Sequence, residues 1–519
     1  MRKYILIFAG LLASALLGAT DFKSLRTKSQ TLPEGTVIEG IVVSDWHSEN
    51  TELNPNLEWD RVDISLSHKT AYIESVDGQY GLRLVFDAQY FNRLERGSLV
   101  SIDLSGCTLT AEKNPERYTI SGILGGKVTL KKASVPIPVK ERTIAELKDE
   151  DIYTQVRLGG VEFLSKQGSF SNIYEKCTTE TPINRTDVDI HYHAADGWAQ
   201  LLEDGNGDNI YLQVNSKCQW RRNNIGVPKG IGCVNAVVVT GDNRRYGGSF
   251  GSYSLRPMVG EDIDIPMEHA SSFSPIVSWR WDRNYDGKLH FRDAGEMRWM
   301  GATKEKAVCG DVLLPESGNG TLTLTNNCGM KLCNEYDGRH CTDANGIGAR
   351  KQAALLIEGK CSEWIRGNGN GALLIETSTK GVSGKGLVFN FSLLGGKGTF
   401  TSACDLPSFW TVEWSTDGSR FQPTGFKTRI RPLAWEGTNN GKSGYAPTSY
   451  DCAMGFSEYS IKLPASLLGA EKLYIRIIPV GDSVTEVSTD AVDDINSIKR
   501  GGNAGETAVK FGMIELKAY

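Results

Sequence analysis

One acidic segment of this 519-residue chain has the residue types and spacing of a metal-binding loop. The segment DRNYDGKLHFRD runs from Asp282 to Asp293, with Gly287 at position 6, where the chain must turn sharply. Twelve-residue loops of this kind wrap Ca²⁺ in oxygen ligands from alternating positions. The predicted ligands are Asp282, Asn284, Asp286, the backbone carbonyl of Lys288, and Asp293. The ion would stabilise structure and take no part in catalysis.

The loop resembles those of EF-hand and dockerin proteins, with two departures. Position 12 is the shorter Asp293 instead of glutamate, and the preceding IVSWRW is typical of a strand instead of a helix. An Asn/Asp/Gly turn between two strands is the alternative interpretation.

Two other polar clusters have a simpler explanation than metal binding. Asp189, His191 and His193 would share one face of a strand, but no further His or Cys follows at a zinc-site spacing. Asp204, Asn206 and Asp208 belong to a segment typical of a tight hairpin. We therefore expect exposed strand histidines and a turn.

Tryptophan side chains are the main candidates for ligand contact, since exposed aromatic rings can stack on sugar rings. Trp410 and Trp414 would share one face of a strand. Burial in a β-sandwich core is the competing explanation for both. Trp435 lies in a Gly/Asn-rich segment, LAWEGTNNGKSG, where burial has less reason to occur, so it is the preferred candidate.

Signatures of catalysis and of nucleic-acid binding are missing from the sequence. It contains no Gly-x-Ser-x-Gly, His-Glu-x-x-His or Walker motif. The net charge is −5, and no block of Lys and Arg stands out, which disfavours double-stranded nucleic acid as a partner. We expect a non-enzymatic protein.

The amino terminus, MRKYILIFAGLLASALLGAT, predicts a secretory signal peptide. Cleavage is expected after Ala19, or alternatively after Ala15. The first cysteine is Cys107, so an N-terminal lipoprotein is not expected. No later segment is apolar for the roughly 20 residues that a transmembrane helix needs.

The chain has eleven cysteines, and export would permit disulfides. For the cluster Cys328, Cys333, Cys341 and Cys361, disulfides are favoured over zinc because close Cys-x-x-Cys pairs are missing. Cys404 with Cys452 is a plausible pair. Cys177, Cys218 and Cys233 would allow one bond, with one thiol left over.

The elements that position these residues are short strands, and the first half of the chain is duplicated. GTVIEGIVVSD, the hairpin around Asp77-Gly78 and RGSLVSIDLSG recur about one hundred residues later as YTQVRLGGVEFLS, LLEDGNGDNIYLQV and GIGCVNAVVVTG. Thr143-x-x-Glu146 predicts a capping box between the copies. Each copy fits a small barrel of the OB type.

On these motifs, residues 35–265 resemble the tandem OB-like domain of unknown function in envelope proteins of Gram-negative anaerobic bacteria. The resemblance implies the fold and a location in the envelope, and it assigns no activity. A polar insertion between Trp46 and Lys69 departs from that pattern and would cap or extend the first barrel.

The remaining chain predicts a jelly-roll or lectin-like β-sandwich. FWTVEWSTDGSRFQP and KLYIRIIPVG are similar to galactose-binding-like modules of envelope proteins. The expected fold class is all-β, with these limits: signal peptide 1–19, linker 20–34, OB-like domains 35–140 and 141–268, and sandwich 269–519.

The expected function is an exported binding protein of the cell envelope that recognises glycan through its C-terminal sandwich. Polysaccharide or an envelope protein is the expected partner, and Ca²⁺ is the only expected cofactor. Two alternatives stay open: an adhesin or assembly component that binds an envelope protein, and a hydrolase of unrecognised type.

Overall fold

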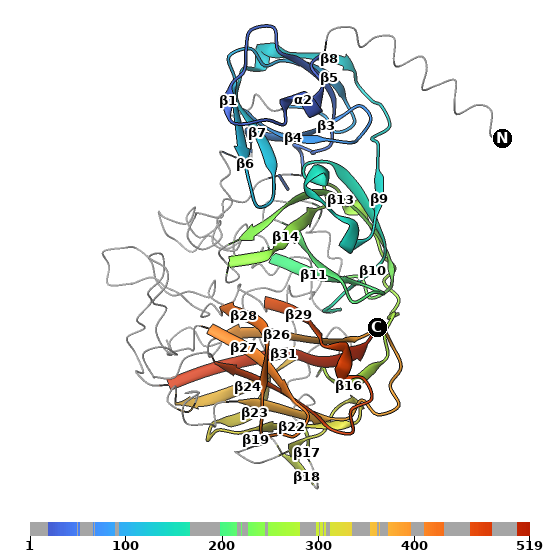
Figure 1. Ribbon diagram of the computed structural model, residues 1–519, viewed down its shortest axis with the longest axis vertical. Helices are drawn as coiled ribbons and strands as arrows, with labels where there is room; N and C mark the ends of the chain where they lie inside the picture. Colours follow the sequence, from blue (N-terminus) through green and yellow to red (C-terminus); the bar gives the residue numbers. More distant parts are fainter. Residues whose placement is uncertain are drawn as a thin grey trace, which may run out of the picture.

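The computed structural model describes most of the chain, and its described part is almost entirely β-structure. The described residues are 19–48, 50–51, 66, 68–88, 93–166, 198–214, 220, 227–243, 248–280, 297–299, 302–304, 306–307, 312–334, 353–360, 363, 372–395, 409–429, 457–479 and 506–519. Two barrels, blue and green in Figure 1, precede a sandwich that runs from yellow to red. The predicted all-β fold class is confirmed.

Barrel 1 has the strand connections expected of an OB-like unit. β3 pairs with β2 and β4, β7 runs parallel to β4, and β5 returns to β2. The fourth barrel strand is split, because β5 pairs with β2 while β6 pairs with β7. The strands are β2 (Val37–Val42), β3 (Thr70–Ser75), β4 (Gly81–Phe86), β5 (Leu99–Asp103), β6 (Thr108–Glu112) and β7 (Arg117–Ile123), with β1 (Gln30–Thr31) and β8 (Val128–Lys132) at the edges.

Barrel 2 repeats this topology with an unbroken fourth strand. β13 pairs with β10 through its first half and with β14 through its second half, which closes the sheet. β12 and β14 run parallel, as β4 and β7 do in barrel 1. The strands are β10 (Gln155–Phe163), β11 (Trp198–Asp204), β12 (Asn209–Val214), β13 (Gly232–Asn243) and β14 (Gly248–Arg256), with β9 (Lys140–Arg142) and β15 (Ile263–Asp264) at the edges.

The C-terminal sandwich consists of two eight-stranded sheets that enclose one apolar core. The β31 sheet contains β16 (Pro275–Trp279), β19 (Lys306–Ala307), β21 (Ser317–Gly318), β23 (Gly329–Asn334), β24 (Ala353–Lys360), β26 (Leu387–Gly395), β29 (Ser457–Leu463) and β31 (Glu506–Ala518). The β30 sheet contains β17 (Met297–Trp299), β18 (Ala302–Lys304), β20 (Val312–Leu313), β22 (Gly320–Leu324), β25 (Leu373–Thr377), β27 (Phe409–Ser415), β28 (Gln422–Arg429) and β30 (Leu473–Pro479).

The residues that follow the predicted signal peptide belong to barrel 1, although the sequence suggested a linker. Helix α2 (Phe22–Leu25) buries Phe22 and Leu25 in the barrel core. β1 then pairs with β6. Phe22 and Leu25 are the only side chains of this one-turn helix that pack into the core, and the residues around them are polar. The apolar pattern was therefore too short to predict a buried helix.

Two local predictions can be checked directly. The capping box is confirmed: the Thr143 N–H donates to Glu146 at the start of the 3₁₀ helix η4 (Ile144–Glu146). The Asp77-Gly78 hairpin is also confirmed between β3 and β4. The insertion after Trp46 reaches barrel 2, where the amide of the buried Asn50 donates to the carbonyls of Gln213 (3.1 Å) and Pro257 (2.6 Å).

Candidate ligand-binding face of the sandwich

The predicted site residues fall into two groups. Trp435 and the whole loop Asp282–Asp293 lie outside the described residues, so their roles stay predictions. Trp410 and Trp414 are described, and they do share one face of β27. That face is the inner one: Trp410 is 0 % exposed within the core, and Trp414 is partly buried against it. The Trp410 ring is therefore core packing and cannot stack on a ligand.

The opposite face of the same sheet carries polar and aromatic side chains. Along β30, Leu473, Ile475 and Ile477 point into the core, so Tyr474 and Arg476 point outward and are partly exposed. β25 alternates in the same way and turns Glu376 outward. We call this surface the β30 face: Glu376, Glu413, Phe421, Lys472, Tyr474 and Arg476.

Strand register brings these outward residues together from three strands. Tyr474 lies directly opposite Glu376 of β25 on one side and Ser415 of β27 on the other. Two positions along, Arg476 lies opposite Glu413 of β27. Directly opposed side chains on antiparallel strands are close enough to interact. The sheet therefore brings Glu376, Glu413, Tyr474 and Arg476 together, and Phe421 joins them from the turn between β27 and β28.

The first group on the β30 face is centred on the Tyr474 hydroxyl. Tyr474 donates to Glu376 Oε1 (3.3 Å), and Lys472 Nζ lies 3.0 Å from the same oxygen. The hydrogen bond to Glu376 and the contact with the Tyr474 hydroxyl raise the pKa of Lys472. The tyrosine ring thus has a hydrogen-bond donor and an acceptor beside its hydroxyl group.

The second group is an ion pair over an aromatic ring. Arg476 Nε donates to Glu413 Oε2 (2.8 Å), and the guanidinium lies 3.9 Å from the centroid of the Phe421 ring. The Arg476 side chain is 22 % exposed and that of Glu413 8 %. Stacking and pairing together hold the planar guanidinium in one orientation.

The turn between β27 and β28 fixes the edge of this face. The Asp417 carboxylate accepts hydrogen bonds from the N–H groups of Arg420 and Ser419, both 2.8 Å, which hold its pKa well below the usual range. Gly418 has φ of +73° and lies so close to the Tyr474 ring that a Cβ would stand 3.1 Å from it. The turn therefore packs against the Tyr474 ring and supports it.

The other broad face of the sandwich is already covered. On the β31 sheet, Asn390, Glu458 and Lys517 point away from the core, yet all are buried against barrel 2. Among the faces that the structure describes, the β30 face is therefore the one that the sandwich can offer to a ligand.

Metal and thiol chemistry have little support among the described residues. That part of the chain holds no cluster of three or more His, Cys, Asp or Glu suited to a metal ion. Cys107 and Cys233 are free thiols there, so the predicted bond within barrel 2 does not include Cys233. Outside the described residues lie the His191/His193 cluster and the cysteines Cys177, Cys218, Cys341, Cys361, Cys404 and Cys452, so the pairings that involve them stay predictions. No described helix is long and apolar enough to cross a bilayer.

The residues of the β30 face were not predicted as site residues from the sequence. The alternation of apolar and polar residues in KLYIRIIP predicts that Tyr474 and Arg476 point outward, so these two residues could have been identified from the sequence. Their partners Glu376 and Glu413 lie 98 and 63 residues away in sequence. Only the strand register reveals those contacts.

Comparisons with known proteins identify no family. No family model matches the chain, and neither does any curated protein. A carbohydrate-binding module solved with β-1,4-galactotriose is 8 % identical over 37 % of this chain and 88 % of its own, with a TM-score of 0.16. The N-terminal tandem carbohydrate-binding modules of Paenibacillus barcinonensis Xyn10C are 12 % identical over 61 % and 71 %, with a TM-score of 0.22.

A third similar structure is the K3 cleaved adhesin domain of Lys-gingipain from Porphyromonas gingivalis W83. It is 13 % identical over 36 % of this chain and 91 % of its own, with a TM-score of 0.17. Scores this low carry no argument about function, so the proposal below depends on the geometry of the β30 face.

Proposed function

We propose that this chain is an exported, non-enzymatic protein of the cell envelope that binds glycan through the β30 face of its sandwich. The leader sequence that ends near Ala19 supports export, and the resemblance of the two barrels supports an envelope location. The absence of hydrolase motifs from the sequence supports a binding role over a catalytic one.

The observation that carries the proposal is the arrangement around Tyr474 and Arg476. A sugar ring presents an apolar face and a rim of hydroxyl groups, and it needs an aromatic surface with donors and acceptors beside it. Tyr474 provides the ring, and the Lys472–Glu376 and Arg476–Glu413 pairs provide the polar groups. Because Arg476 is paired with Glu413 and stacked on the Phe421 ring, this pair needs little ordering of side chains on binding.

Two predictions from the sequence extend this proposal. Trp435 would add a second aromatic contact, whereas Trp414 lies on the inner face of β27, away from the β30 face. A Ca²⁺ ion held by Asp282, Asn284, Asp286, Lys288 and Asp293 would steady the sandwich. Trp410 is left out because its ring is buried.

A glycan array probed with the full chain tests the proposal. We expect binding to bacterial or host polysaccharides, and a loss of about three- to tenfold in affinity for Tyr474→Ala, the range of an aromatic contact. Tyr80→Ala is the matched control. Tyr80 is a partly buried tyrosine of barrel 1 with a cation, Arg26, over its ring, just as Lys472 lies over the ring of Tyr474. Repeating the array with EDTA tests the Ca²⁺ loop separately.

Binding to an envelope protein is the outcome that would replace this proposal. No signal on any glycan, together with one envelope protein that co-purifies with the chain, would favour the adhesin or assembly role. Equal affinity of wild type and Tyr474→Ala for a bound glycan would place the site elsewhere.

A further inference from the structure

The two barrels use the same strand to contact the next part of the chain. β3 of barrel 1 ends in Ile73-Glu74-Ser75, and β11 of barrel 2 ends in Leu202-Glu203-Asp204. In each triplet the first residue is in the barrel core and the third anchors the hairpin turn. The middle residue is a glutamate that points out of its barrel, yet it is 0 % exposed at Glu74 and 1 % at Glu203.

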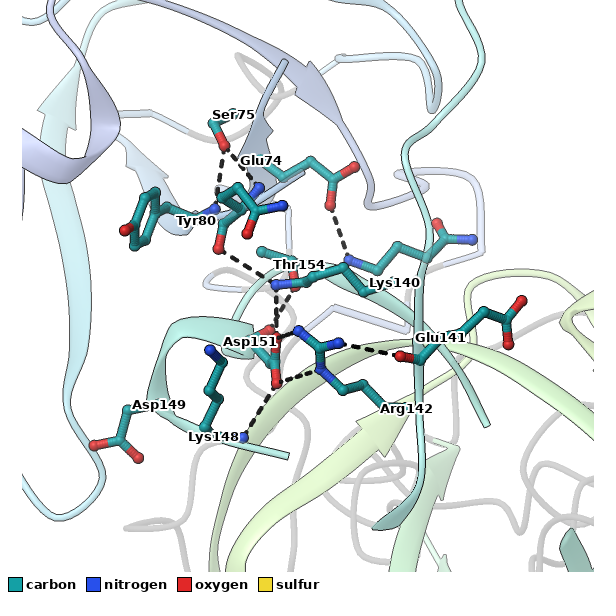
Figure 2. A network of polar contacts seen from close by, with 12 residues as sticks. Glu74, Ser75, Tyr80, Lys140, Glu141, Arg142, Lys148, Asp149, Asp151 and Thr154 are labelled. Carbon is teal, nitrogen blue, oxygen red and sulfur yellow. Dashed lines mark hydrogen bonds and ion pairs between the residues drawn. The ribbon is translucent and has the colours of Figure 1, made fainter. Parts of the chain in front are cut away.

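Glu74 meets barrel 2 at the first residue of β10. Its Oε2 accepts a hydrogen bond from the Gln155 N–H at 2.9 Å (Figure 2). The charged groups that act on it are Lys140 of β9 and Asp77 of its own hairpin. Burial raises the pKa of Glu74 to about 8, against the lowering effects of the Gln155 N–H and Lys140. The carboxyl is therefore neutral at pH 7 and satisfies a backbone donor of the neighbouring barrel.

Aromatic packing surrounds this contact. The ring of Tyr72, two residues before Glu74, stacks on that of Tyr153 with centroids 5.2 Å apart and planes 8° apart. Gly81, opposite Glu74 on β4, leaves room for the Tyr153 backbone, since a Cβ would stand 2.3 Å from the Tyr153 carbonyl carbon. The junction is close-packed and excludes side chains larger than glycine at that point.

Glu203 occupies the equivalent place between barrel 2 and the sandwich. Its carboxylate accepts hydrogen bonds from Lys517 Nζ and from the Asn390 amide, the latter at 3.2 Å. Leu201, two residues earlier, donates its N–H to Glu458 of β29 at 2.8 Å. Leu201 and Tyr211 also pack with Leu164 and Met513 in a small apolar cluster.

The tips of the two hairpins also contact later parts of the chain in equivalent ways. Gly78 and Gly207 have φ of +70° and +69°, and each lies against a residue from later in the chain. A Cβ on Gly78 would stand 2.6 Å from Pro138, and one on Gly207 would stand 2.7 Å from the Tyr519 ring. The duplication therefore preserved a docking geometry along with a fold.

We infer that Glu74 and Glu203 are equivalent positioning residues, through which each barrel docks the face of its second and third strands onto the following unit. The face that OB folds commonly use for oligonucleotides and oligosaccharides is thereby occupied in both barrels. The barrels act as a stiff support that orients the sandwich, and they do not bind ligand through these strands. The inference is independent of the glycan proposal.

Hydrogen–deuterium exchange on the full chain tests the inference. Glu203→Ala removes the hydrogen-bonded carboxylate from the buried Lys517, which keeps only the more distant Glu515 at 3.5 Å. We therefore expect exchange at the barrel 2–sandwich junction, including the Leu201 amide, to rise by about tenfold or more. Glu74→Ala should do the same at Gln155 while leaving Leu201 protected. Small-angle scattering should show a longer maximum dimension for both variants.

Two controls separate docking from general destabilisation. Glu471→Ala removes an exposed glutamate paired with Lys380 and should change neither measurement. Glu74→Gln keeps the acceptor for the Gln155 N–H and should restore protection. If Glu203→Ala misfolds, the Glu74 pair still decides the question. Unchanged exchange and scattering in Glu74→Ala, or equal effects of Glu74→Gln and Glu74→Ala, would overturn the inference.

Discussion

At the scale of single residues, the molecule places several ionisable groups where water is excluded. Glu458 of β29 is buried against barrel 2, and burial raises its pKa to about 8 from an ordinary value of 4.5. Glu515 shows the opposite result: burial opposes its ionisation, but Arg280 and Lys517 lower its pKa to about 2. The two Arg280 and Lys517 charges beside Glu515 thus outweigh its burial, whereas the single backbone donor at Glu458 does not.

This difference predicts a pH dependence of stability. The Glu458 carboxyl ionises near pH 4.5 in the unfolded chain and near pH 8 in the folded one. Its contribution is therefore complete below about pH 4.5 and is lost as pH rises through about 8, by up to about 1.4 kcal/mol per pH unit. The melting temperature should fall between pH 5 and pH 8.5. In Glu458→Gln, which cannot ionise, the fall should be smaller; an identical pH profile would contradict this account.

At the scale of elements, helix α2 completes barrel 1 from outside the repeated strand pattern. Phe22 and Leu25 are buried, while Lys23 and Ser24 of the same helix are exposed. Arg26 follows and lies over the ring of Tyr118, with 4.7 Å to the centroid. The segment that the sequence presented as a linker is thus an essential part of the barrel.

Removal of a buried side chain from this helix should therefore destabilise barrel 1. We expect Phe22→Ala to cost about 3–5 kcal/mol in the free energy of unfolding, the range for an aromatic side chain removed from a core. Urea unfolding, followed by a probe in barrel 1, measures the loss. Lys23→Ala on the same helix should lie within about 0.5 kcal/mol of wild type. Equal stability of the two variants would show that α2 does not support the core.

Local patterns in the sequence were sufficient for many elements but not for the site. The Asp77-Gly78 hairpin, the Thr143–Glu146 capping box and the duplication depend on neighbouring residues, and all appear in the structure. The prediction that Trp410 contacts ligand is wrong, because alternation along a strand defines two faces without showing which of them is buried. The contacts of Tyr474 and Arg476 arise from register between distant strands, which no local pattern encodes.

At the scale of the whole molecule, the chain forms a row of three units (Figure 1). Each contact between units contains buried polar side chains, such as Glu74 at the first and Glu203 at the second. Arg96 of barrel 1 binds Asp262 of barrel 2 at 2.8 Å, and Lys462 of the sandwich binds Asp208 of barrel 2 at 2.6 Å. Gly207 of barrel 2 also lies against the Tyr519 ring at the contact between barrel 2 and the sandwich. We expect this row to hold the β30 face at a fixed distance from barrel 1.

The hairpin tip offers a test of this arrangement. Gly207→Ala adds a methyl group against the Tyr519 ring, and it should lower the melting temperature of the full chain. Gly205→Ala in the same turn meets nothing within 4 Å and should have little effect. Gly251 has a similar positive φ of +86°, and the Cβ added by Gly251→Ala would meet nothing within 4 Å, so this variant measures backbone strain. An equal loss in Gly251→Ala and Gly207→Ala would show that strain, and not docking, is responsible.

The central claim is that the β30 face binds glycan, and hydroxyl-radical footprinting of the full chain tests it most directly. With the best ligand from the array in excess, we predict that oxidation of Tyr474 and Phe421 falls several-fold, while that of Tyr80 in barrel 1 stays unchanged. Protection of residues elsewhere, with Tyr474 and Phe421 oxidised as in the free protein, would contradict the account.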